Sequence, residues 1–149
     1  MTSTSAWIGR QAWTAANAVM LLAFGFSVAV QVNDPDPWMW IAIYGAAALV
    51  CAFELRRRVH PAIPALVSIA ALAWAVTIAP RVIGHVPFVE MFAEFEMRNV
   101  GVEESREMYG LLIVAVWMAT VAAAARRRRV TAVASTQGAE RTQHEVRVP

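Results

Sequence analysis

Four long apolar runs, nearly free of charged residues, constrain this chain more than any other feature of its sequence. A helix needs about 20 apolar residues to cross the roughly 30 Å hydrocarbon core of a bilayer. Hydrophobic residues make up 58% of the 149 residues and charged residues 16%, whereas a soluble domain carries about 25% charged residues. The charges are also gathered between the runs. The sequence therefore predicts an all-α membrane protein, a bundle of four transmembrane helices.

The predicted spans cover residues 12–32, 38–55, 63–80 and 108–125. The arginines that follow the second and fourth runs mark their ends, and Pro64 lies in the first turn of the third, where a missing N–H costs little. Residues 1–129 are predicted to form the transmembrane domain. The polar, aperiodic segment 130–149 is predicted to be a disordered cytoplasmic tail.

The first run has a second interpretation. Arg10, the apolar run and the small residues Ser27-Val28-Ala29 could form a signal peptide with its cleavage site. The run is longer than a usual signal core and contains Asn17, so we expect a retained span, with cleavage as the alternative. Asn17 is expected to form a hydrogen bond between helices.

The thirteen basic residues are all arginines, and they are unequally distributed between the two ends of the predicted bundle. Eight flank the runs at one end: Arg10, Arg56 to Arg58 and Arg126 to Arg129. Three lie at the other: Arg81, Arg98 and Arg106. Arginine-rich connections stay in the cytoplasm, so both termini are predicted to be cytoplasmic, with the plasma membrane of a bacterium as the expected location. No nucleic-acid partner is expected, because the interleaved aromatic residues of such a surface are missing.

The connection between the first two spans is rich in polar residues. Asn33, Asp34 and Asp36 favour a turn, and this is the better interpretation of the segment alone. Gln31 and the two carboxylates nevertheless exceed what a turn requires. Their oxygens could bind a hard cation or a polar headgroup.

A second polar segment, Glu103–Gly110, opens the fourth run. Acidic residues in a first helical turn favour the helix dipole, which is the structural explanation. Glu107 fits that explanation least well, because it lies nearest the apolar run, where an ionisable group is costly. Arg106 is expected to pair with Glu103, and Gly110 would let another helix approach closely.

The remaining candidates are weaker. Residues 85–98 have the helical spacing of a short amphipathic segment before the last helix. Glu54, in the last turn of the second span, is expected to snorkel or to pair with Arg56 to Arg58. Cys51 is expected to act as a small hydrophobe. No nucleotide-binding or hydrolase motif is present, and the sequence names no cofactor and no metal.

Two of these segments resemble the hallmarks of the transmembrane protein 220 family. The first is Gln31-Val32-Asn33-Asp34-Pro35-Asp36 followed by Trp40 and Tyr44, and the second is Glu103 to Leu111 followed by Trp117. The resemblance extends from Asn17 to Trp117 and implies a small multi-helix membrane protein. It does not imply a reaction.

We therefore expect a polar, net-acidic site at the non-cytoplasmic end of the bundle. Its candidate ligand-binding residues are Gln31, Asn33, Asp34, Asp36, Trp40, Tyr44, Glu104, Arg106 and Glu107. The leading hypothesis is a protein that binds a cation or a polar lipid headgroup. The alternatives are a structural protein that assembles with a membrane partner or a second copy, and a membrane-embedded enzyme acting on a lipid-like substrate.

Overall fold

The computed structural model describes residues 3–33, 37–83 and 100–147, which form four long helices. They are α1 (Ser3–Val30), α2 (Pro37–Leu55), α3 (Ala62–Val82) and α5 (Val100–Arg147), with a short 3-10 helix, η1 (Gln31–Asn33), after α1. The described residues contain no strand. Each long helix includes a stretch long and apolar enough to cross a membrane. The predicted all-α, four-span architecture is therefore confirmed.

The structure differs from the sequence-based expectation in the last segment. A disordered tail is predicted from Val130, but α5 continues as a helix to Arg147. Residues 130–147 contain no proline and one glycine, and extending an existing helix needs no new nucleus. Residues 129–138 are all exposed, so this part of α5 is not buried in the bundle. The predicted amphipathic segment at residues 85–98 lies outside the described residues.

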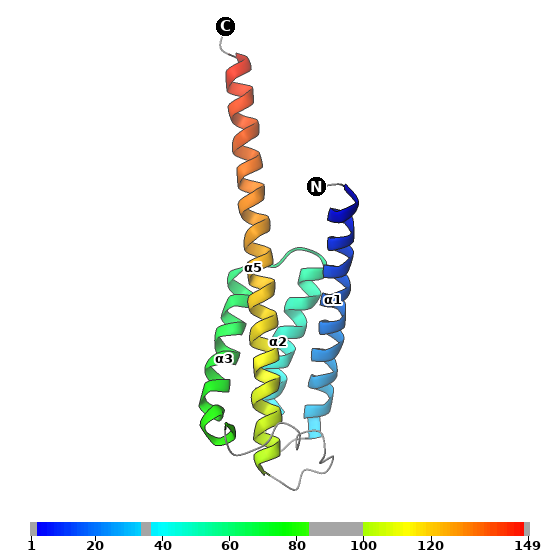
Figure 1. The fold of residues 1–149 in the computed structure, drawn as a ribbon, viewed down its shortest axis with the longest axis vertical. Coiled ribbons are helices and arrows are strands. Elements are labelled where there is room, and N and C mark those ends of the chain that lie inside the picture. The colour runs from blue at the N-terminus through cyan, green and yellow to red at the C-terminus, as the bar shows by residue number, and fades with distance from the viewer. Residues whose placement is uncertain (1–2, 34–36, 84–99, 148–149) are drawn as a thin grey trace.

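The helices associate as two pairs (Figure 1). The first pair is α1 with α2, the second is α3 with α5, and α2 joins the two pairs. Ala71 and Ala75 of α3 are buried and let the α5 backbone approach closely. At this contact the Ser68 hydroxyl donates a hydrogen bond of 2.7 Å to the carbonyl oxygen of Ala115.

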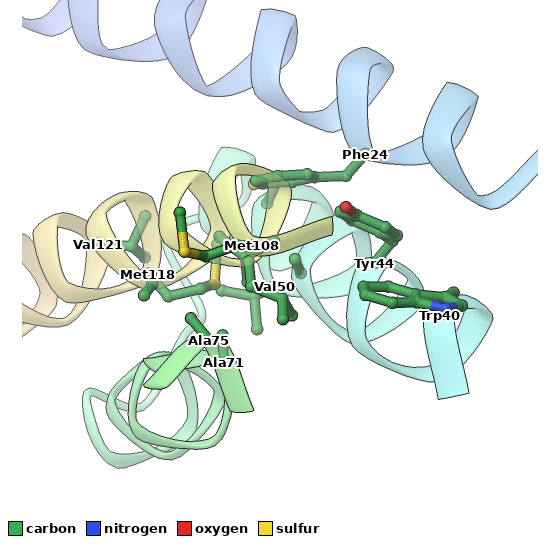
Figure 2. Packing of buried hydrophobic residues seen from close by; sticks show 14 of the residues in the cluster. Phe24, Trp40, Tyr44, Val50, Ala71, Ala75, Met108, Met118 and Val121 are labelled. Atoms are coloured by element: carbon green, nitrogen blue, oxygen red, sulfur yellow. The ribbon is translucent and has the colours of Figure 1, made fainter. Parts of the chain in front are cut away.

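The buried core follows one stripe of α5, with members three or four residues apart, as helix packing requires. The stripe consists of Met108, Leu111, Val114, Ala115, Met118, Val121 and Ala125. Figure 2 shows part of it between α3 and the aromatic residues of α2, with Phe24 reaching in from α1. Leu22, Phe26 and Val116, in contrast, are between 66% and 74% exposed. Such large exposed apolar side chains suit a surface that faces lipid.

Both termini lie at the same end of the bundle, together with the α2–α3 turn (Figure 1). We call this the arginine end, because Arg10, Arg56–Arg58 and Arg126–Arg129 lie there. The opposite end, where α1 and α3 finish and α2 and α5 begin, is called the acidic end.

The α2–α3 turn contains a backbone conformation that is unusual for its residue. Arg57 has φ of +53°, in the left-handed region. The Arg57 N–H donates to the Glu54 carbonyl at 2.8 Å and the Arg58 N–H to the Phe53 carbonyl at 3.2 Å. This is a Schellman ending, in which glycine is usual at the position of Arg57. A left-handed conformation costs a non-glycine residue about 1–2 kcal/mol.

Candidate site at the acidic end

The two polar segments singled out from the sequence meet at the acidic end. Trp40 and Tyr44 lie one turn apart on α2, and Glu107 and Gly110 lie in the early turns of α5. The Tyr44 hydroxyl lies directly against the α-carbon of Gly110, where a Cβ would overlap it. Glu107 lies three residues, less than one helical turn, before Gly110 on α5. Figure 2 shows Tyr44 with its oxygen beside α5.

A row of aromatic rings extends from this contact to α3. Tyr44 stacks on Phe24 at 6.4 Å and on Trp40 at 6.2 Å between ring centroids. Trp40 stacks in turn on Trp74 at 4.5 Å. Trp40 and Tyr44 are 7% and 8% exposed, so their rings are held by packing on both sides.

Trp74 also lines a groove of about 480 Å³ between α2 and α3. Met39, Ala42, Ile43 and Ala46 form one wall, and Leu66, Val67 and Ala70 complete the other. All these side chains are apolar. The groove therefore accepts hydrocarbon and offers no side-chain partner to a charged group.

Two charged residues at this end, Arg81 and Glu104, form an ion pair. Arg81 Nε lies 2.7 Å from Glu104 Oε1, with side chains 59% and 23% exposed. An ion pair this accessible contributes about 0.2–1 kcal/mol, but it compensates the Glu104 carboxylate. Arg106 and Glu107 are half-buried and also have interaction partners.

The structure locates part of the predicted site. Trp40 and Tyr44 stack on each other, and Tyr44 contacts α5 at Gly110, three residues after Glu107. Gln31 lies half-buried in η1, and Glu104 pairs with Arg81. Asp34, Asp36 and the side chains of Asn33 and Glu103 lie outside the described residues, as does the expected Arg106–Glu103 pair. The described residues contain no group of three or more His, Cys, Asp or Glu side chains that could hold a metal ion.

A second polar cluster, which was not predicted as a site, lies toward the arginine end. The Glu54 side chain is 1% exposed. Trp13 Nε1 donates to Glu54 Oε1 at 3.0 Å, and Arg128 Nη2 donates to Oε2 at 2.6 Å. The expected pairing with Arg56 to Arg58 is therefore wrong. Those arginines follow the last residue of α2, whereas Arg128 comes from the facing helix α5.

The first span is tied to the second by this cluster. Asn17 Nδ2 donates to the carbonyl oxygen of Cys51 at 2.7 Å, so the expected interhelical bond is confirmed. Trp13 also stacks on Trp117 of α5, with ring centroids 5.6 Å apart. Among the described residues, Asn17 Oδ1 and Trp117 Nε1 are buried without a hydrogen-bond partner. The sequence signal for this cluster was Glu54, an ionisable group at membrane depth.

The sequence is similar to that of a known family of membrane proteins. The family described as "Transmembrane family 220, helix" matches residues 23–123, which include both polar segments. Transmembrane protein 220 of Xenopus laevis is 31% identical over 110 residues, 73% of this chain. The alignment covers 58% of that relative, so this chain spans little more than half of its length. No solved structure matches. The chain is a multi-pass membrane protein and belongs to the transmembrane 220 family.

Proposed function

We propose that this protein binds a membrane lipid at the acidic end, with the polar headgroup beside Tyr44 and Glu107 and an acyl chain in the α2–α3 groove. Gln31, Asn33, Asp34, Asp36, Glu104 and Arg106 complete the proposed headgroup region. The observation that carries the proposal is the position of Trp40. Its ring stacks on Tyr44 on one side and on Trp74, a wall of the groove, on the other.

A lipid fits the described residues better than a cation alone. Hard cations require several oxygen ligands, and Glu104 is already compensated by Arg81. A headgroup needs fewer charges, and Arg106 could meet its phosphate. The neighbouring apolar groove also has no use in a simple cation site, whereas it suits the acyl chain of a lipid.

Native mass spectrometry with elemental analysis tests the proposal. The purified protein should retain a stoichiometric lipid, and Glu107→Gln should raise the Kd for that lipid by about tenfold, so that its occupancy falls, because one charge-assisted hydrogen bond is removed. Glu140→Gln, which removes one carboxylate near the other end of α5, is the matched control. A stoichiometric metal without lipid would favour a cation site instead, and equal lipid occupancy in both variants would contradict the proposal.

A structural role is the second candidate, because specific contacts favour it. The Arg81–Glu104 ion pair and the Tyr44–Gly110 contact both tie α5 to a neighbouring helix. In that case the polar segments would lock helix ends, or present them to a membrane partner or a second copy. Every variant of these residues would then lose stability, and no lipid would be found.

We also propose that the arginine end faces the cytoplasm of a bacterium, with the chain in its plasma membrane. The arginine bias supports this orientation. Reporter fusions after the α5 extension and within the residue 84–99 connection would test it. The proposal requires a cytoplasmic reporter to be active only at the first position.

A further inference from the structure

A pocket of about 500 Å³ at the arginine end is distinct from the site at the acidic end. Its polar lining comes from three parts of the chain that are distant in sequence: Arg10 of α1, Arg57 of the α2–α3 turn, and Thr120, Arg127 and Arg128 of α5. At this end α1 and α5 are joined by side chains, through the Trp13–Trp117 stack and the Glu54 cluster. The pocket lies between α1 and α5, on the arginine-end side of the Trp13–Trp117 stack.

The pocket carries an excess of positive charge. Of its four arginines, Arg128 is paired with Glu54. Among the described residues, no ion pair involves Arg10, Arg57 or Arg127. Arg10, Arg57 and Arg127 are exposed residues that line one pocket, and guanidinium groups bind phosphate through paired charge-assisted hydrogen bonds.

Two of the lining side chains are fixed by the fold. The carboxylate of Glu54 is almost fully buried and accepts hydrogen bonds from both Trp13 and Arg128. Trp13 is further held by its stack on Trp117. One wall of the pocket is therefore built before any ligand arrives, which lowers the entropic cost of binding.

One of the lining arginines, Arg57, also has an unusual backbone conformation. The left-handed backbone of Arg57 would suit glycine, yet an arginine occupies it and lines the pocket. Strained backbone conformations concentrate at ligand-binding sites, where the side chain has a use that outweighs the strain. The ordinary role of arginines in setting membrane orientation does not require one at this particular position.

We propose that this pocket binds the phosphate group of an anionic membrane lipid. Arg126–Arg129 follow the apolar part of α5, so the pocket lies at the level where lipid headgroups meet water. Anionic headgroups are attracted there by basic residues. Trp13 and the small residues of α1 and α5 form the apolar side of the pocket, against which the glycerol and the first chain carbons pack.

The test is a titration of the full chain in nonionic detergent with dihexanoyl-phosphatidylglycerol, followed by microscale thermophoresis. Dihexanoyl-phosphatidylcholine and inorganic phosphate are titrated in parallel. The variant Arg10→Gln/Arg127→Gln should raise the Kd for phosphatidylglycerol by at least tenfold, because it removes two charge-assisted contacts. The matched control, Arg56→Gln/Arg58→Gln, removes two exposed arginines of the same end that do not line the pocket and should change the Kd less than threefold.

Arg57→Gly separates binding from folding. Glycine relieves the left-handed strain, so this variant should melt at a higher temperature than the wild type in the absence of lipid, while its Kd for phosphatidylglycerol rises. Equal losses of affinity in the pocket and control variants would overturn the proposal, because they would indicate nonspecific attraction of the anionic lipid to all arginines of this end. Equally tight binding of phosphatidylcholine would overturn the anionic specificity, and equally tight binding of inorganic phosphate would overturn the lipid as the source. A wild type that binds none of the three probes would also contradict the proposal.

Discussion

Arg128→Met is expected to destabilise the protein by about 3 kcal/mol, because it leaves the buried Glu54 carboxylate without its charged partner. Glu54 is 1% exposed and keeps only the Trp13 N–H when Arg128 is removed. The value lies at the low end of the usual range for buried pairs, since the Arg128 side chain is itself 28% exposed. Reversible unfolding in mixed detergent micelles measures the change.

Two further variants identify the cause. Arg129→Met removes the adjacent, exposed arginine and should leave the free energy of unfolding almost unchanged. Glu54→Gln combined with Arg128→Met removes both charges and should recover most of the lost stability. If Arg128→Met and Arg129→Met proved equally stable, the buried ion pair would not hold α2 and α5 together as described.

Gly110→Ala is expected to cost about 1–3 kcal/mol, the usual effect of adding a methyl group to a packed core. The new Cβ would overlap the Tyr44 hydroxyl. Tyr44 cannot easily move away, because its ring is stacked on both Phe24 and Trp40. Thermal unfolding in detergent measures the loss.

The expected rescue makes this prediction specific. Tyr44→Phe removes the overlapping oxygen, and the Tyr44 ring carbon that bears it would lie 3.4 Å from the new Cβ, an ordinary contact. Gly110→Ala with Tyr44→Phe should therefore be more stable than Gly110→Ala alone. Gly45→Ala is the control, because a Cβ there meets only Val28 at 4.0 Å. Additive effects of the two changes would mean that the polar segments do not meet at this point.

Much of the architecture follows from the sequence alone. Apolar runs bounded by arginines predict the four spans, because hydrocarbon thickness fixes the length of a spanning helix. Asn17 could be assigned an interhelical bond, because an amide within hydrocarbon needs a partner. The convergence of Tyr44 and Gly110 could be expected only in outline, from two polar segments at the same predicted end.

The partners of Glu54 could not be predicted, for a physical reason. Spacing along the chain favours nearby arginines, whereas the actual partner depends on which face of α5 turns toward α2. That choice is made by packing of the whole bundle, through contacts such as Ser68 with Ala115. The sequence does not predict the α5 extension, because a polar composition indicates disorder. The extension is nevertheless helical, because adding residues to an existing helix needs no new nucleus.

Photo-crosslinking with a phospholipid that carries a diazirine in its acyl chain tests the central claim most directly. The protein is labelled in bilayer nanodiscs, and the modified residues are mapped by peptide mass spectrometry. The account predicts that labels concentrate on half-buried groove residues such as Ile43, Val67 and Trp74, and that excess unlabelled lipid reduces this labelling. Labels spread evenly over lipid-facing residues such as Leu22, Phe26 and Val116 would contradict a bound lipid at the acidic end.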